Sequence, residues 1–432
     1  MLLNHRHQRA VGQGFFHTAQ LGVRGGAHLH YVYDCGSMQK YAHHRNARID
    51  EYLNEMGAGS QLDLLYISHA HADHLNGLPR LLHKSSGLRI DTIMMPLIGV
   101  EDRLIAFART AAVDRQSLKG QFYRDFIADP LSAVGRFGPR QVLVVEPGNR
   151  DDGAPGPDDP RPPEGGEDLS GPRGEHGGPI WKLVGKGTIK QGDVQINEKA
   201  GVSGTCISVV PDTAAIYIPS TQHQISWLLA PFVDPGTTSL KYKFMGILAK
   251  KRGITRRKLR AWLDRVDNLK SLLNNHVAEL RNAYREISDD INITSLCLYS
   301  GPKPPIAPAN TRLISYSFGD WVANQNSRIG WLATGDASLR NGKRCAEFLL
   351  HYQNLSDQVV TLTMPHHGAD SSFNQKLLTN VNPTFCVAAA DLIRNWKHPG
   401  PETIQTVASH GLFLQVVTSA ERSEVRERAW LM

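Results

Sequence analysis

Residues 69–74 read His-Ala-His-Ala-Asp-His, directly after the apolar run Leu62-Asp-Leu-Leu-Tyr-Ile-Ser68. The run predicts a buried strand, because its apolar character is almost continuous. Three imidazoles and a carboxylate at this density seldom serve packing, since each buried imidazole needs a hydrogen-bond partner. These groups suit Zn²⁺ or a similar transition ion. In an extended loop the first two histidines point to one side while Asp73 and His74 point elsewhere, so the stretch can serve two neighbouring ions.

Three segments in the C-terminal third of the chain also place polar residues in the loop after a predicted strand. Loops that leave the same edge of a sheet can converge, so these residues are candidates to complete a metal site with the 69–74 loop. They are Asp336 after a strand at 329–333, His366 and His367 after a strand at 359–364, and His398 after a strand at 384–390.

Asp320 competes with Asp336 for the role of a carboxylate that bridges two ions, held ~3.5–4 Å apart as in two-metal hydrolases. The strands at 312–318 and 329–333 look like a hairpin, which places Asp320 at its turn and Asp336 at the opposite end. Asp336 is preferred because it leaves its strand in the same sense as the segment that carries His366.

Composition and cysteine usage are those of an ordinary soluble protein. The 432 residues are 41% hydrophobic and 21% charged, enough for a large core. The N-terminus lacks the apolar segment of a signal peptide, and no apolar run approaches the ~20 residues that cross a bilayer. The five cysteines lie far apart with no CxxC pair. The sequence therefore predicts a cytoplasmic protein with reduced thiols and no membrane span.

Two segments differ from the rest of the chain. Residues 147–180 contain 17 Gly or Pro and eight acidic against three basic side chains. This composition predicts a flexible, disordered acidic loop, because it buries too little apolar surface to offset the ordering entropy. Residues 241–290 carry apolar side chains at three- and four-residue spacing, which predicts one long amphipathic helix inserted into the domain.

The helical insertion contains a basic segment. Seven cations and no acid lie between Lys250 and Arg260, in a chain of net charge +7. Arg256, Arg257 and Arg260 are therefore candidates to contact a nucleic acid or another phosphate, although a solvated helix face is the ordinary alternative. A third possibility is that the insertion at 241–290 docks a protein partner.

With these motifs the chain resembles the metallo-β-lactamase superfamily. The motif His-x-His-x-Asp-His stands here as four metal ligands: His69, His71, Asp73 and His74. Asp336 matches the family's bridging carboxylate and His366 its late ligand histidine. Tyr33-Asp34-Cys-Gly resembles the early strand-end aspartate that supports the ligand loop, which implies a supporting role for Asp34. The C-terminal motifs more narrowly resemble the soluble hydrolase domain of the bacterial DNA-uptake channel ComEC.

The resemblance implies an α/β fold over residues 1–432, the four-layer αββα metallo-β-lactamase sandwich, interrupted by the two insertions. It also implies a pair of divalent ions, Zn²⁺ or Mn²⁺. One departure concerns the family's additional ligand histidine before the bridging aspartate. Here His223 is the only near candidate, and the strand that begins around Ser295 is expected in its place. A single-ion or Mn²⁺-favouring site therefore stays open.

The expected activity is that of a metal-dependent hydrolase, foremost a phosphodiesterase or nuclease acting on a nucleic acid or nucleotide. Asp73 is expected to orient the attacking hydroxide, and His367 or His398 to protonate the leaving group. Lys397 is a candidate phosphate contact. The alternatives are a small-molecule hydrolase, acting on a lactone, thioester or cyclic nucleotide, and a partner-docking protein.

Overall fold

The protein is described by a computed structural model, which places most of the chain. The described residues are 2–23, 28–156, 161–174, 178–191, 204–219, 226–236, 238–287, 293–304, 311–317, 320–324, 328–391 and 398–431.

The first of two large sheets has eleven strands. Its centre, β3 to β6 followed by β9, is parallel. On one side of it, β2, β1 and β19 follow in that order, each antiparallel to its neighbour. In spatial order the strands are β14 (Asp320–Asn324), β13 (Thr311–Ser317), β19 (Val425–Leu431), β1 (Leu2–Gln8), β2 (Gly14–Val23), β3 (His28–Ser37), β4 (Gln61–Tyr66), β5 (Arg89–Pro96), β6 (Gln141–Glu146), β9 (Cys206–Pro211) and β8 (Lys190–Gln191).

The second sheet has eight strands, with one parallel half and one antiparallel half. In spatial order they are β18 (Phe413–Val417), β17 (Phe385–Ala389), β16 (Val359–Thr363), β15 (Gly330–Ala333), β12 (Ser295–Pro302), β11 (Trp227–Asp234), β10 (Ala214–Ile218) and β7 (Lys182–Gly185).

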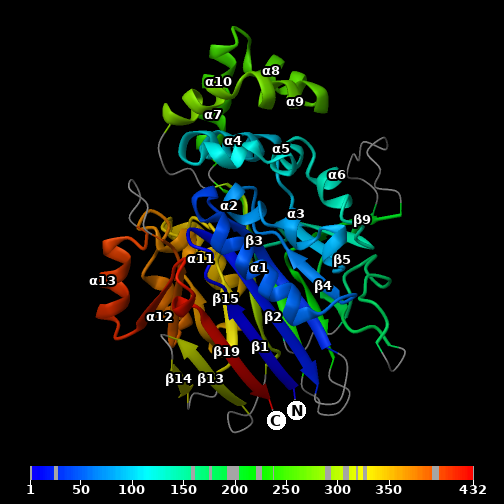
Figure 1. The fold of residues 1–432 in the computed structure, drawn as a ribbon, viewed down its shortest axis with the longest axis vertical. Coiled ribbons are helices and arrows are strands. Elements are labelled where there is room, and N and C mark those ends of the chain that lie inside the picture. Colours follow the sequence, from blue (N-terminus) through cyan, green and yellow to red (C-terminus); the bar gives the residue numbers. More distant parts are fainter. Residues whose placement is uncertain are drawn as a thin grey trace.

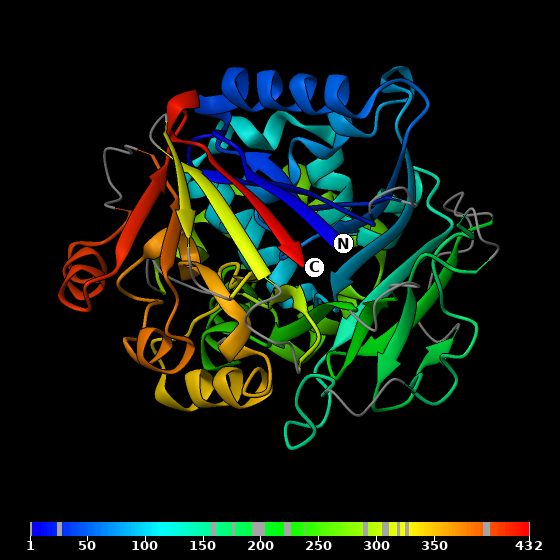
Figure 2. The ribbon, with the colours of Figure 1, turned by 90° about the horizontal axis from the view of Figure 1, so that it is seen from below.

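One apolar core lies between the two sheets, and each sheet has one further core between it and the helices that cover it. The strand β4 shows why its sequence is largely apolar: Leu64 and Tyr66 join the core between the sheets, whereas Leu65, which lies between them in the sequence, joins the core under the helices. Side chains alternate between the two faces of a strand, so a strand covered on both faces needs apolar residues at successive positions. The molecule is thus a mixed α/β structure with helices on the outer sides of two sheets (Figures 1 and 2).

The helices fall into three groups. On the first sheet lie α1 (Ala42–Met56), α2 (Ala72–Leu75), α3 (Leu78–Leu81), α4 (Val100–Val113), α5 (Gln121–Ala128) and α6 (Pro130–Gly135). On the second sheet lie α11 (Gly342–His351), α12 (Lys376–Val381) and α13 (Pro401–Ser409). The third group stacks on α4 and α5 at the end of the molecule farthest from the termini: α7 (Thr238–Lys251), α8 (Arg256–Leu263), α9 (Val266–Asn275) and α10 (Val277–Arg285) (Figure 1).

The prediction of one long helix at 241–290 is therefore wrong. The chain turns after α7 at Gly253, whose φ of +64° is accessible to glycine at little cost. Thr255 then caps α8 by accepting a hydrogen bond from the backbone N–H of Lys258. The apolar spacing nevertheless continues, because each short helix turns its own apolar face toward the same layer. Leu259 and Leu280, for example, belong to one core.

Two other predictions need correction. The expected hairpin of 312–318 with 329–333 does not form, because β13 pairs with β14 and β19 in the first sheet, while β15 pairs with β12 and β16 in the second. The described parts of 147–180 form a loop, as expected, but they pack on the body: Ala154 and Leu169 are buried, and Gly171 hydrogen-bonds Trp181.

Within the described ranges, no helix has both the length and the apolar composition needed to cross a lipid bilayer. All five cysteines are free thiols.

Candidate metal centre

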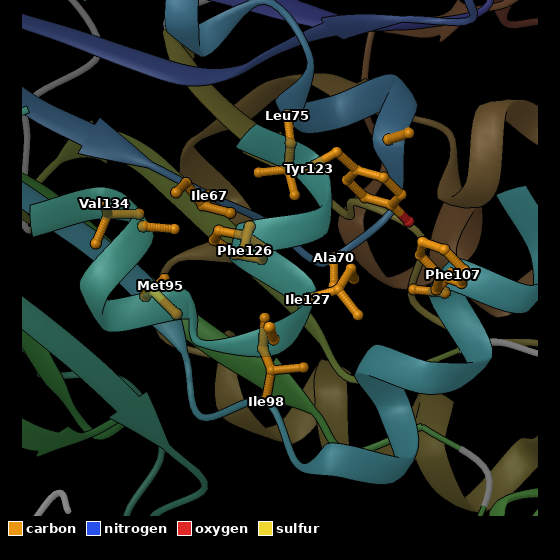
Figure 3. Packing of buried hydrophobic residues seen from close by; sticks show 14 of the residues in the cluster. Ile67, Ala70, Leu75, Met95, Ile98, Phe107, Tyr123, Phe126, Ile127 and Val134 are labelled. Carbon is orange, nitrogen blue, oxygen red and sulfur yellow. The ribbon is translucent and has the colours of Figure 1, made fainter. Parts of the chain in front are cut away.

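The 69–74 loop leaves the end of β4 and turns at once into the short helix α2. It is held close to the neighbouring strand β3. A Cβ added at Gly36 would lie 2.6 Å from the carbonyl oxygen of Asp73, so only glycine permits this approach. Ala70 and Leu75 pack under α4 and α5 among Phe107 and Tyr123 (Figure 3). The apolar residues of the loop thus anchor it, and its polar residues are left to face the second sheet.

Asp336 lies at the centre of these polar residues. It follows β15 and donates its backbone N–H to Oγ of Ser295 on β12. Its Oδ2 lies 3.2 Å from Nε2 of His69 and 3.2 Å from Nδ1 of His71. Its Oδ1 lies 3.7 Å from Nε2 of His74. The two carboxylate oxygens therefore face different histidines, which is the arrangement expected of a bridging carboxylate.

His366 and His367 follow β16 and both adopt left-handed backbone angles, with φ of 51° and 59°. Such angles are uncommon outside glycine and often mark functional sites. Nε2 of His366 lies 3.6 Å from Oδ2 of Asp336, whereas Nε2 of His367 lies 3.8 Å from Oδ1 of Asp336 and 3.7 Å from Oδ2 of Asp73. The two neighbouring histidines thus face opposite oxygens of the same carboxylate.

Hydrogen bonds outside the cluster orient these imidazoles. Oδ2 of Asp34 accepts from Nδ1 of His74 at 2.7 Å, and Asp34 also accepts from the backbone N–H and hydroxyl of Ser68. The carbonyl of Ala389 accepts from Nδ1 of His367 at 2.7 Å. With Nδ1 donating in both rings, Nε2 is the nitrogen that offers a lone pair to a metal when the ring is neutral.

The charges of the buried groups also favour a cation. Burial alone would raise the pKa of Asp336, but the surrounding imidazoles, led by His366, hold it well below the usual range. Burial lowers the pKa of His71 and His366 well below the usual value, and the charge of Arg109 lowers both further. At neutral pH the carboxylate is ionised and these imidazoles are neutral, which are the protonation states of metal ligands.

His74 is the exception. Burial lowers its pKa, but the Asp34 carboxylate more than compensates and raises it to about 9. The ring therefore carries a proton at neutral pH that a bound cation would displace, so metal binding here releases a proton.

Several buried atoms lack a hydrogen bond within the part of the chain that the structure describes. These are Nε2 of His71, His74 and His367 and Oδ2 of Asp73. A buried polar atom without a partner costs about 1–3 kcal/mol. Among the described residues, the donor atoms of His69, His74 and Asp336, and those of Asp73, His74 and His367, are each compact enough to hold an ion. Imidazole and carboxylate donors fit Zn²⁺ or Mn²⁺, so the residues present fit a divalent metal.

Most residues proposed from the sequence come together here: Asp34, His69, His71, Asp73, His74, Asp336, His366 and His367. His398 lies at the edge, its ring centroid 5.6 Å from that of His366. Arg256, Arg257 and Arg260 lie apart from the site, on α8. Asp320 is on β14, at the far edge of the first sheet. Lys397 and His223 lie outside the described residues.

Arg109 on α4 is the principal site residue that sequence reasoning missed. Its Nη1 lies 2.9 Å from Nδ1 of His71, and its Nη2 lies 3.1 Å from Nε2 of His366. The signal was present, because Arg109 is the one charged residue in the stretch Leu104–Val113. A cation on the apolar side of a helix is rarely buried without a partner of its own.

Imidazoles and carboxylates from both sheets thus converge in one buried cluster. This cluster can hold divalent metal. No protein-family model matches the chain, and no curated protein matches it.

Proposed function

We propose that the protein is a metal-dependent hydrolase of the metallo-β-lactamase superfamily, close to the ComEC-type domain, and that it cleaves phosphodiester bonds in a nucleic acid or nucleotide. The observation that carries the proposal is the convergence of the 69–74 loop, Asp336 and the His366–His367 pair around the two oxygens of one carboxylate.

The fold supports the family. Two sheets with a shared core and helices on their outer sides are compatible with the four-layer αββα sandwich that the motif implies. The ligand loops leave the ends of parallel strands in both sheets, as β4 does in the first sheet and β15 and β16 do in the second. Loops with this origin meet at one edge of the sandwich.

A bound divalent ion supplies Lewis acidity, which lowers the pKa of a neighbouring water toward ~7 and offsets negative charge on phosphoryl oxygens. Asp73, His74, His367 and Asp336 are the residues proposed to hold it. Burial raises the pKa of Asp73, but the charges of His74 and Arg109 outweigh this and leave it below the usual range. Its carboxylate is therefore ionised at neutral pH and can orient the attacking water by accepting a hydrogen bond from it.

His398 is half-buried at the rim of the cluster, so substrate is proposed to approach from its side. Burial lowers the pKa of His398 to about 4. Its imidazole is therefore neutral at pH 7, and we propose that it donates a hydrogen bond to the substrate phosphate. Protonation of the leaving group by an imidazolium at this position is disfavoured by that pKa.

A phosphodiester is favoured over a neutral ester because the chain carries positive charge at Arg109 in the site and on α8, apart from it. Arg109 reaches into the cluster, and the basic surface of α8 lies on the helices stacked over α4. Cations attract and orient polyanions, and they add nothing to the binding of a lactone.

The test is a substrate panel of single- and double-stranded DNA, RNA, bis-p-nitrophenyl phosphate and a lactone, each with Zn²⁺, Mn²⁺ or EDTA. The proposal predicts metal-dependent cleavage of at least one phosphodiester, abolished in Asp336→Asn. If only the lactone is hydrolysed, the protein is a small-molecule hydrolase. If no member reacts while metal is bound, the assignment as a phosphodiesterase fails.

A further inference from the structure

Arg109 occupies an unexpected position for a residue in a metal site. It is 4% exposed, and its Nη1 lies 3.9 Å from Oδ1 of Asp73 in addition to its contacts with His71 and His366. Guanidinium only donates hydrogen bonds and keeps its charge at any physiological pH. The two imidazole nitrogens that it contacts are therefore acceptors, with their lone pairs directed at Arg109.

The position of Arg109 is fixed by the helices stacked over α4. Asp102 precedes Arg109 by two helical turns and so lies on the same face of α4. Oδ2 of Asp102 accepts a hydrogen bond from Nζ of Lys241 on α7 at 2.8 Å, and Oδ1 accepts from the backbone N–H of Thr294. Leu280 on α10 joins the same core as α4. The insertion thus contacts the face of α4 that carries Arg109.

A metal ion and this guanidinium compete for the same lone pairs. A zinc ion bound to Nδ1 of His71 would lie about 2.0–2.1 Å from it. Nη1 of Arg109 already lies 2.9 Å from that nitrogen, and Nη2 lies 3.1 Å from Nε2 of His366. An ion placed between these histidines would meet a second positive charge at close range in a buried site, where repulsion is poorly screened.

The donors that Arg109 does not contact also indicate one ion. Without Nδ1 of His71, which lies 2.9 Å from Nε2 of His69 and 3.2 Å from Oδ2 of Asp336, the compact donor groups both use His74, and each takes a single atom from it. Nδ1 of His74 is engaged by Asp34, so Nε2 is the atom left for a metal. One lone pair binds one ion. The donor group that contains His69 and the donor group that contains His367 therefore bind the same ion, either as alternatives or together.

We propose that Arg109 is a built-in cation that takes the place of the first metal ion of a two-metal site. It holds His71 and His366, and the chain binds one divalent ion through His74 and its neighbours. This inference rests on the proposed function, because it assigns the metal content of that same centre.

The test is metal stoichiometry after equilibrium dialysis against Zn²⁺ or Mn²⁺, measured by mass spectrometry of the metal. The wild-type chain is expected to bind one ion. Arg109→Gln is expected to bind a second ion or to raise the affinity of the second binding event at least tenfold. Arg109→Lys keeps the charge and should retain one ion. Arg115→Gln removes an exposed arginine just beyond α4 and serves as the matched control, with one ion expected.

The outcomes separate this inference from the proposed function. Two ions in the wild-type chain overturn the inference but leave the hydrolase proposal standing, whereas no ion overturns both. One ion in folded Arg109→Gln, with unchanged affinity for a second, overturns the inference alone. If Arg109→Gln does not fold, His366→Ala provides the test instead. This variant should retain one ion with unchanged affinity, because His366 is held by Arg109 and not by the metal. A lost or weakened ion in His366→Ala would contradict that arrangement.

Discussion

Nδ1 of His74 lies 2.7 Å from Oδ2 of Asp34, and both residues are almost fully buried. Asp34 sits at the end of β3 with a left-handed φ of 56°, and its carboxylate also accepts two hydrogen bonds from Ser68. The pair couples the strand before the ligand loop to the loop itself. It fixes the tautomer of His74 and directs Nε2 toward Asp336.

Asp34→Asn is expected to weaken metal binding about 10–100-fold, the range typical of lost hydrogen bonds to a ligand histidine. Asparagine tolerates the left-handed backbone, so the fold is retained. Competition with a chromogenic chelator measures the affinity. An unchanged dissociation constant would contradict the supporting role of Asp34.

Asp336→Asn is expected to reduce both metal affinity and phosphodiesterase activity by at least about 100-fold, because the amide is a poor ligand for Zn²⁺. Asp264→Asn, at an exposed position on the helical insertion, is the matched control and should leave both unchanged. Full activity in folded Asp336→Asn would show that the reaction occurs elsewhere on the chain.

Neutralising the basic surface of α8 is expected to weaken oligonucleotide binding and to flatten its salt dependence. The slope of log K against log salt falls by roughly 0.7–0.9 for each phosphate that the protein no longer neutralises. The variant changes Arg256, Arg257 and Arg260 to Gln, and the control changes the exposed Arg89, Arg136 and Arg422 to Gln. Equal slopes in the two variants, measured by fluorescence anisotropy, would restrict α8 to a structural role.

Stability is expected to fall below pH 6.5, in part through His351. Burial lowers the pKa of this histidine to about 4, and its Nε2 donates to the carbonyl of Pro231. Between pH 6.5 and 4 the unfolded chain binds a proton that the folded chain excludes, so the folded state loses stability as pH falls. From pH 7 to 5 this amounts to about 2 kcal/mol.

His351→Gln keeps a donor and does not titrate. Urea unfolding at pH 7 and pH 5 should therefore show a smaller acid loss for this variant than for the wild-type chain. His410→Gln, at an exposed position, should behave like the wild type. If the free energy of unfolding decreases as much between pH 7 and pH 5 in His351→Gln as in the wild type, His351 does not contribute to the loss of stability in acid.

The sequence predicted most of the site because ligand chemistry is carried by short motifs. Two such motifs are local: β4 with the 69–74 loop, and β16 with His366 and His367. Their residue types indicate a buried strand followed by candidate metal ligands. The choice of Asp336 over Asp320 was also right about location. Its supporting argument, a hairpin between their strands, was wrong, because strand pairing depends on residues far apart in the chain.

Other features were hidden because they depend on tertiary contacts. The sequence of strand β1 is polar, yet the strand is buried inside a sheet. Arg6 pairs with Glu427 on β19, and His7 pairs with Glu424 in the turn before β19. Both partners lie over 400 residues away in the chain. Arg109 gave only a weak signal, because its partners lie on other elements. The breaks between α7 and α10 escaped detection because the apolar spacing continues across them.

Diffraction from crystals soaked in Zn²⁺ or Mn²⁺, recorded at the absorption edge of the metal, would locate the ion that we propose this cluster holds. We expect an anomalous peak within about 2.0–2.2 Å of Nε2 of His74, with Asp336 and either His69 or His367 also coordinating the ion. A peak elsewhere on the chain, with the 69–74 loop and Asp336 free of metal, would contradict this proposal.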